Sequence, residues 1–275
     1  MNRPEATEPA VASGRFSMHG LTAVVTGAAH GIGRAVASDF AVAGASVVCI
    51  DIDADGLDDS VREITRRGGS ARAVVADVTD DPALTDKINE SVPTAGCIDV
   101  LANVAGAITG RGDILDVPQE SMLRGWQLNL ASMITAARAV VPHMPARGGA
   151  IVNVASGTLD ALAPGLGTYT IPKAGVLQLT RTLAMELGAR NIRVNAVSPG
   201  YIDTAMTAHH YRNVDGSIDT AARERIHRDQ CAATALKRIG TAREIATVVR
   251  FLSSGEASFI TGQVLRVNGG SAMPL

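Results

Sequence analysis

A tyrosine and a lysine stand four residues apart in the sequence Tyr169-Thr-Ile-Pro-Lys173. Side chains four apart on a helix share one face, so this spacing places an ammonium group beside a phenol hydroxyl. A close positive charge favours the phenolate, which makes Tyr169 a candidate acid or base near neutral pH. Because YxxxK also occurs often by chance, the motif needs support from its surroundings.

Ser156 gives that support. It lies upstream of Tyr169, just past the apolar run Ile151-Val-Asn-Val154, which is typical of a buried strand. Ligands bind at the carboxyl ends of strands in α/β sheets, and a hydroxyl there can hydrogen-bond and polarise a substrate carbonyl. The three side chains together predict a site for proton transfer to or from a substrate oxygen.

A glycine-rich turn, Thr26-Gly-Ala-Ala-His-Gly-Ile-Gly33, stands between the first predicted strand and the first predicted helix. Glycines remove Cβ atoms, so the backbone can turn tightly and approach a pyrophosphate. The helix N-terminus then supplies unpaired N–H groups and a partial positive charge. A plain turn would also use glycine, but the position between strand and helix favours nucleotide binding.

Asp51 ends the next predicted strand, 20 residues after Gly31. A carboxylate in this place can accept hydrogen bonds from an adenosine ribose diol. A 2′-phosphate would instead face Asp51 and Asp53, and no Arg or Lys is adjacent in sequence to bind it. The pattern therefore predicts NAD(H) over NADP(H); the alternative is an Asp that caps a helix or turn.

Short β-branched runs alternate with segments of helical spacing from Leu21 onward, and Tyr201 to about Gln230 is polar and irregular. The predicted strands are 21–26, 46–51, 71–77, 98–103, 149–154, 192–197 and 263–267. The predicted helices are 31–43, a segment around 61–64 that ends at Gly68-Gly69, then 81–92, 119–143, 169–189 and 242–253. This alternation indicates an α/β fold, a single-domain Rossmann-like doubly wound parallel sheet with helices on both faces.

Composition limits the remaining choices. The 275 residues carry 25 Lys+Arg against 27 Asp+Glu, a formal charge of −2, which argues against a nucleic-acid partner. Three scattered cysteines form neither a disulfide framework nor a zinc motif. No apolar stretch suits a signal peptide or a membrane span. We expect a flexible arm over 1–18, one catalytic domain over 19–275, no metal, no membrane contact and a cytoplasmic location.

From about Leu21 to Gly270 the chain resembles a short-chain dehydrogenase/reductase of the common short subtype. The family's motifs occur in order: TGxxxGxG at Thr26–Gly33, Asp77-Val78, Asn103-Val-Ala-Gly106, Asn129, Ser156, Tyr169 with Lys173, Pro199-Gly-Tyr-Ile-Asp-Thr204, Ile260-Thr-Gly-Gln263 and Asn268-Gly-Gly270. Two positions depart from the pattern. Val104 replaces the second Asn of NNAG, and Pro172 precedes Lys173, so the helix that carries Tyr169 should begin within a few residues of Thr168.

The resemblance implies four catalytic residues. Tyr169 would give or take the hydroxyl proton, and Ser156 would hold the substrate oxygen. Lys173 would lower the Tyr169 pKa and bind the nicotinamide ribose. Asn129 would hold a water that links Lys173 to solvent; the alternative is a residue that stabilises a helix kink.

The resemblance also implies a cofactor site. Asp77 would meet the adenine amino group and Val78 would line the adenine, while Ile202 and Thr204 would hold the carboxamide. The whole predicted NAD site comprises Gly27, His30, Gly31, Ile32, Gly33, Asp51, Ile52, Asp77, Val78, Asn103, Ala105, Gly106, Tyr169, Lys173, Pro199, Gly200, Ile202 and Thr204.

The predicted function is an NAD(H)-dependent oxidoreductase that interconverts a secondary alcohol and a ketone, with Tyr169 as acid or base. The alternatives are an NADPH-dependent 3-oxoacyl (acyl-carrier-protein) reductase and a non-enzymatic NAD-sensing scaffold. Candidate substrate contacts are Ser156, Leu159, Tyr201 and Met206, under a lid over about 203–232; His209-His210 there are either pocket or surface residues. The family usually forms homotetramers, here through 119–143 and 169–189. Their Ala136, Ala137, Ala174 and Ala184 would allow close helix approach, although core packing within one subunit would use the same residues.

Overall fold

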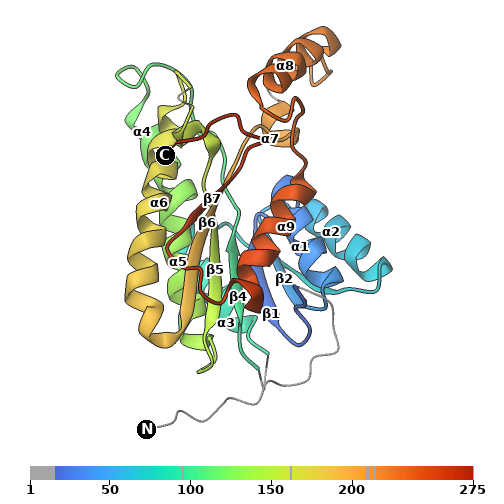
Figure 1. The fold of residues 1–275 in the computed structure, drawn as a ribbon, viewed down its shortest axis with the longest axis vertical. Coiled ribbons are helices and arrows are strands. Elements are labelled where there is room, and N and C mark those ends of the chain that lie inside the picture. Colours follow the sequence, from blue (N-terminus) through green and yellow to red (C-terminus); the bar gives the residue numbers. More distant parts are fainter. Residues whose placement is uncertain (1–15, 94–95, 162, 209–210, 214, 275) are drawn as a thin grey trace.

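The computed structural model describes residues 16–93, 96–161, 163–208, 211–213 and 215–274. Within these residues lies one parallel sheet of seven strands, in the order β3-β2-β1-β4-β5-β6-β7 (Figure 1). The strands are β1 Thr22–Thr26, β2 Ser46–Asp51, β3 Ser70–Val75, β4 Val100–Asn103, β5 Gly149–Val154, β6 Ile192–Pro199 and β7 Val264–Val267. The predicted doubly wound fold is confirmed, and each predicted strand is present to within two residues.

Helices cover both faces of the sheet (Figure 1). On one face pack α1 Gly31–Val42, α2 Ala54–Arg66 and α9 Ala242–Ser253. On the other face pack α3 Asp81–Glu90, α4 Gln119–Trp126, α5 Ser132–Val140 and α6 Gly167–Leu187. Neighbouring residues of β1 separate the two cores, since Val25 joins the first and Val24 the second, as the period of two in a strand requires.

The chain reverses its direction of travel across the sheet at β1. This strand pairs in parallel with β2 on one side and β4 on the other. The first three strands build outward from β1 to the β3 edge, and the chain then crosses back to β4. Open α/β sheets bind ligands in the crevice at such a switch point, beyond the carboxyl ends of the strands.

The predicted arm over 1–18 is wrong at its end, because residues 16–18 pack on the domain. Met18 is fully buried in the core beside α1 and α9. Phe16 packs edge to face on Phe251 of α9, with ring centroids 5.6 Å apart. Both side chains gain by leaving water. The rest of the predicted arm, 1–15, lies outside the described residues.

The predicted irregular region after Tyr201 is also wrong, since it contains α7 Ala205–Ala208 and α8 Thr220–Ala233. The N-cap Asp219 starts α8 by accepting the N–H of Ala222 at 2.9 Å. Ala222 is also the buried residue of this helix, so the sequence shows no apolar stripe that would reveal it. His209-His210 lie outside the described residues.

Three of the alanines expected at a subunit interface are used inside the subunit. Ala136 and Ala137 of α5 and Ala184 of α6 are buried in the core beneath the sheet, whereas Ala174 of α6 is exposed. For these three the alternative holds, core packing within one subunit, because the sheet already covers them. Of the helices that the structure describes, none is long and apolar enough to cross a bilayer.

Candidate active site

The backbone of the glycine-rich turn packs so tightly on itself and on the residues after β4 that two of its glycines leave no room for a side chain. A Cβ on Gly33 would lie 1.9 Å from the carbonyl oxygen of Gly27. Gly27 itself has φ +71°, and a Cβ there would lie 2.9 Å from the Cα of Ala105, just after β4. The turn therefore lies against the carboxyl end of the neighbouring strand, at the switch point. This position agrees with the predicted roles of Gly27, Gly33 and Ala105.

The N-terminus of α1 directly continues the glycine-rich turn. Helix α1 begins at Gly31, and its N-cap residue His30 makes no side-chain cap hydrogen bond. The first N–H groups of a helix have no partner within the helix, and together with the helix dipole they suit an anion such as a pyrophosphate. The turn and helix thus fit the predicted nucleotide.

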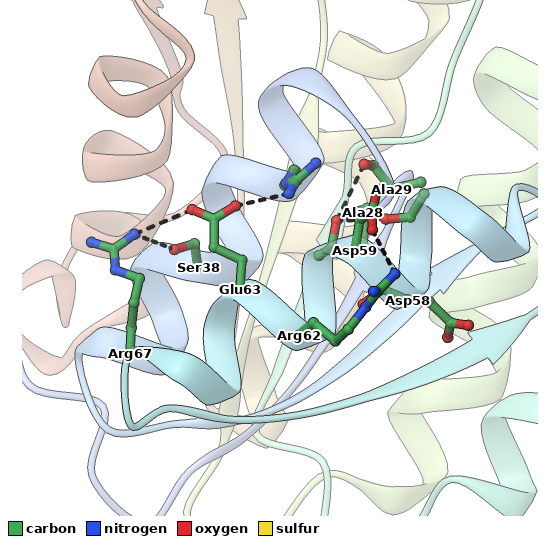
Figure 2. Close-up of polar contacts among 11 residues, drawn as sticks. Ala28, Ala29, Ser38, Asp58, Asp59, Arg62, Glu63 and Arg67 are labelled. Atoms are coloured by element: carbon green, nitrogen blue, oxygen red, sulfur yellow. Dashed lines mark hydrogen bonds and ion pairs between the residues drawn. The ribbon is translucent and has the colours of Figure 1, made fainter.

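Ser60 of α2 holds the turn from behind. Its buried hydroxyl lies 2.9 Å from the carbonyl oxygen of Gly56 in its own helix, 3.0 Å from that of Ala28 and 3.2 Å from that of Ala29. Figure 2 shows Ala28 and Ala29 beside α2. Nearby, Glu63 of α2 binds Arg34 of α1 at 2.8 Å, which joins the two helices. No sequence motif pointed to Ser60, because a serine within a helix carries no signal of which carbonyl it will meet.

Asp51 lies at the end of β2 directly beside the turn. One carboxylate oxygen accepts the N–H of Ala29 at 3.0 Å, and the other accepts the N–H of Asp53 at 3.1 Å. Each oxygen keeps a second lone pair for a ligand hydroxyl. His30 lies 2.6 Å from Asp53, and the N–H of Gly56 together with His30 holds the pKa of Asp53 below its ordinary value.

Two nitrogen-bearing side chains near this edge already contact carboxylates. His30 is paired with Asp53, and Arg34 with Glu63, so Asp51 remains an acceptor for a neutral diol. Farther along, Val78 is buried while Asp77 and Ile52 are exposed at the ends of β3 and β2. These three positions agree with a predicted adenine site.

The three residues of the predicted proton-transfer site come together. Ser156 follows β5, and its oxygen accepts hydrogen bonds from the Thr158 hydroxyl at 2.9 Å and the Thr158 N–H at 3.2 Å. Tyr169 lies close enough to Ser156 for that side chain to lower the Tyr169 pKa. The ammonium nitrogen of Lys173 lies 5.7 Å from the centroid of the Tyr169 ring. The predicted placement of Lys173 and Tyr169 on one face of a helix is therefore confirmed.

The expected effect of Lys173 on Tyr169 is not observed. Burial raises the pKa of Tyr169, and the nearby Ser156 side chain offsets only part of this rise. Burial also lowers the pKa of Lys173 to about 7. The prediction that Lys173 lowers the Tyr169 pKa is wrong for this structure, because desolvation favours the neutral form of both groups.

Lys173 is fixed in a narrow buried space. Its Nζ donates a hydrogen bond to the carbonyl oxygen of Val154 at 2.6 Å. A Cβ on Gly106 would lie 3.2 Å from this nitrogen and 2.7 Å from Oδ1 of Asn129. Gly106 therefore leaves the room in which Lys173 and Asn129 approach each other.

Helix α6 begins at Gly167, which confirms the start predicted from Pro172. Proline has no N–H, so the carbonyl of Thr168 one turn earlier loses its helical partner. This carbonyl lies against Gly125 of α4, where a Cβ would be only 2.2 Å away. Gly125 thus lets α4 approach the first turn of α6 and fix the direction of Tyr169.

The side chain of Asn129 makes its hydrogen bonds to backbone atoms of Ala107 and Gly125. It is fully buried in a π-helical turn, Gln127–Ala131, between α4 and α5. Its Oδ1 accepts the N–H of Ala107 at 3.1 Å, and its Nδ2 donates to the carbonyls of Ala107 and Gly125 at 2.9 and 3.0 Å. This geometry fits the alternative of a residue that stabilises an irregular helix, and the bound water stays a prediction.

Two predicted cofactor residues have side chains committed elsewhere. The buried amide of Asn103 donates to Asn153 at 2.9 Å, and Ile202 is buried in the core beside α9. Only their backbone atoms can meet a cofactor. Thr204 does face the turn, since its Cγ2 lies 3.4 Å from the position of a Cβ on Gly31. The N–H of Val104, the departure from NNAG, donates to the Thr26 hydroxyl at 3.1 Å.

The other predicted substrate residues differ in their surroundings. Leu159 packs against Ala155 and Val176, so it contacts the core as well as the site. Tyr201 follows the carboxyl end of β6, and its ring centroid lies 6.3 Å from that of His227 on α8. Met206 on α7 is exposed. Among the residues that the structure describes, no three His, Cys, Asp or Glu side chains gather as a metal site.

Comparison with known proteins gives consistent results. A family model described as enoyl-(acyl carrier protein) reductase matches residues 27–272. The 3-oxoacyl-[acyl-carrier-protein] reductase FabG of Thermotoga maritima is 38% identical over 92% of this chain and 98% of its own length. The 7alpha-hydroxysteroid dehydrogenase of Escherichia coli K12 is 33% identical over 96% and 98%. A solved structure with bound NADP, described as a candidate NAD(P)-dependent gluconate 5-dehydrogenase from Beutenbergia cavernae, is 36% identical over 94% and 99%, with a TM-score of 0.84.

Proposed function

Because the chain belongs to the short-chain dehydrogenase/reductase family of oxidoreductases, which act on CH–OH groups, we propose that it interconverts a secondary alcohol and a ketone with NAD(H). The observation that carries the proposal is the meeting of three side chains: Ser156 lies close enough to Tyr169 to lower its pKa, and Nζ of Lys173 lies 5.7 Å from the centroid of the Tyr169 ring. The group lies at the carboxyl end of β5, next to the glycine-rich turn. Tyr169 is the acid or base of this proposal.

Each side chain has a separate task. Ser156 holds the substrate oxygen, and Tyr169 gives a proton to that oxygen in reduction or takes it in oxidation. The bound nicotinamide supplies or accepts the hydride. Because burial raises the pKa of Tyr169, its neutral form prevails at pH 7, which suits the acid needed for ketone reduction. Lys173, with its pKa lowered to about 7, can pass a proton on at neutral pH.

The preference for NAD(H) is supported by the charges at the end of β2. The Asp51 side chain keeps free lone pairs for a ribose diol, while His30 is hydrogen-bonded to Asp53 and Arg34 is paired with Glu63. A 2′-phosphate would meet two carboxylates. We expect kcat/KM to be at least about tenfold higher with NADH than with NADPH, a difference of one favourable charged contact.

The test is the ratio of kcat/KM for the two cofactors in three proteins. Asp51→Asn should narrow the ratio by removing the charge. Asp58→Asn is the matched control, because Asp58 is an exposed carboxylate of α2 whose side chain points away from the turn in Figure 2. Equal or better turnover of the wild type with NADPH would overturn the preference.

The runner-up is an NADPH-dependent 3-oxoacyl (acyl-carrier-protein) reductase. Its support is the 38% identity to the T. maritima enzyme that carries this name. A screen of ketones, alcohols and 3-oxoacyl thioesters with both cofactors separates the two functions. A non-enzymatic NAD sensor would have no use for the assembled Ser156, Tyr169 and Lys173, and turnover of any of these compounds excludes it.

We propose a homotetramer with contacts through α4, α5 and α6. Large apolar side chains are exposed on two of these helices, Leu123 and Trp126 on α4 and Ile171 and Met185 on α6. Covering them would remove apolar surface from water. Light scattering should then give four times the chain mass of 28.4 kDa, and a monomer would contradict this part of the proposal.

A further inference from the structure

One carboxylate, that of Asp203, gathers three side chains from the segment that follows β6. It accepts a hydrogen bond from the Tyr211 hydroxyl and another from Nη2 of Arg223 at 2.7 Å. Nε2 of His227 lies 3.4 Å from the same oxygen that Arg223 binds. Arg223 and His227 stand four apart on α8 and so share one face of that helix.

The described residues 205–208, 211–213 and 215–233, here called the lid and lying almost wholly within the predicted lid over about 203–232, have a small core of their own. Ala208, Tyr211 and Ala222 are buried together, with Ile226 packed against them, apart from the cores that flank the sheet. Within the lid the Arg223 guanidinium lies 5.7 Å from the centroid of the Tyr211 ring. Figure 1 shows α8 projecting beyond the body of the domain. Such a unit depends on few attachments to stay in place.

The attachments lie at its two ends. Beyond α8, the N–H of Leu236 donates to the carbonyl of Gly269 at 3.1 Å. At the other end stands Asp203, whose chain neighbours are Ile202 in the main core and Thr204 beside Gly31 of the glycine-rich turn. The Asp203 contacts therefore join the lid to the residues just after β6, which lie between the main core and the glycine-rich turn.

Charge strengthens this attachment. Burial alone would raise the pKa of Asp203, but the hydrogen bonds from Tyr211 and Arg223 outweigh it, and the pKa lies below its ordinary value. Burial and the same hydrogen bond raise the pKa of Tyr211 to about 12. At neutral pH an ionised acceptor thus faces a neutral phenol and a guanidinium, and hydrogen bonds to ionised groups are the strong ones.

We infer that Asp203 is a positioning residue that fastens the lid to the end of β6 and thereby sets Tyr201 against the substrate and Thr204 against the cofactor. The roles of Tyr201 and Thr204 rest on the proposed function, whereas the fastening does not. Asp203 touches neither reacting group and acts through its neighbours. Its loss should weaken substrate binding more than it slows the chemical step.

The experiment compares Asp203→Asn, Arg223→Gln and the double variant with the wild type. The first readout is hydrogen exchange of the α8 amides, 220–233, in protein without cofactor. We expect about tenfold faster exchange in either single variant, as for the loss of one charge-assisted hydrogen bond. The double variant should be no faster than the faster single variant, because both changes break the same contact. Exchange in α5 should not change.

The second readout is turnover. KM for the substrate should rise about tenfold in Asp203→Asn while kcat stays within about threefold, and Arg223→Lys, which keeps the charge, should lie closer to the wild type than Arg223→Gln. If Asp203→Asn does not fold, Tyr211→Phe takes its place. It keeps the ring and loses one hydrogen bond to Asp203, so a smaller rise in the exchange rate of the α8 amides is expected. Asp215→Asn is the control, since Asp215 binds only Ser217 within its own exposed turn.

The outcomes separate the two levels of the inference. Unchanged α8 exchange in Asp203→Asn, or strictly additive effects in the double variant, would overturn the fastening. Faster exchange with an unchanged KM would overturn the positioning role. If the wild type turned over no alcohol or ketone, the proposed function would fail, and the exchange measurements would still decide whether Asp203 fastens the lid.

Discussion

Replacing Lys173 with methionine should remove a pH dependence from the folding stability. Methionine has a similar length and no charge, so it can fill the same buried space. In the folded protein, burial lowers the pKa of Lys173 from its ordinary 10.5 to about 7. Between these values the unfolded chain binds a proton that the folded chain does not. The free energy of unfolding therefore rises with pH in this window. The contribution from neutral Lys173 is fully present above pH 10.5 and is lost as the pH falls through 7.

The magnitude follows from the same displacement. One bound proton is worth about 1.4 kcal/mol per pH unit, so between pH 7.5 and 9.5 the wild type should gain about 2–3 kcal/mol relative to Lys173→Met. The lost hydrogen bond to Val154 lowers the stability of the variant by an amount that does not depend on pH. Only the slope of the difference against pH reports the titration.

The assay is urea unfolding of protein without cofactor, followed by circular dichroism at several pH values from 7.5 to 9.5. Lys87→Met is the matched control, because Lys87 is exposed on α3 and pairs only with Glu90 of the same helix. Its difference from the wild type should stay nearly flat. A flat difference for Lys173→Met as well would refute the reasoning, since Lys173 would then titrate as it does in water.

Two further predictions concern the cofactor turn. Gly33→Ala places a Cβ 1.9 Å from the Gly27 carbonyl oxygen, so the turn must shift, and the Kd for NADH in a fluorescence titration should rise at least about tenfold. Gly188→Ala is the control, because its Cβ would meet no atom within 4 Å and the Kd should not change. Equal Kd values in the two variants would contradict the account. Ser60→Ala removes the one hydroxyl proton that the carbonyls of Gly56, Ala28 and Ala29 share. This should lower the free energy of unfolding by about 1 kcal/mol and weaken NADH binding a few-fold. A Kd for NADH equal to that of the wild type would show that the turn keeps its shape without Ser60.

The glycine-rich turn and Asp51 could be placed from the sequence because each belongs to a local pattern. A strand of apolar residues followed by glycines and a helix needs no knowledge of distant contacts, and the ends of two adjacent parallel strands must lie side by side. Tyr169 and Lys173 share a helix face for the same local reason. Their relative positions are therefore confirmed by the structure.

The properties that failed depend on distant packing. The pKa of Tyr169 is set by how much water the whole fold removes from it, and no spacing of four residues contains that information. Asn129 meets Ala107 only because a π-helical turn brings them together. Helix α8 is mostly exposed and has no apolar stripe, so neither the helix nor its contacts with Asp203 could be recognised in the sequence.

The measurement that tests the central claim most directly is turnover and NADH binding by Tyr169→Phe. Phenylalanine keeps the ring and loses the hydroxyl whose pKa Ser156 lowers. With the best substrate found in the alcohol and ketone screen, kcat should fall by a factor of about 10² to 10⁴, the range for a lost general acid or base. The Kd for NADH should stay within about twofold of the wild type. A variant that kept kcat within a few-fold of the wild type would contradict proton transfer by Tyr169.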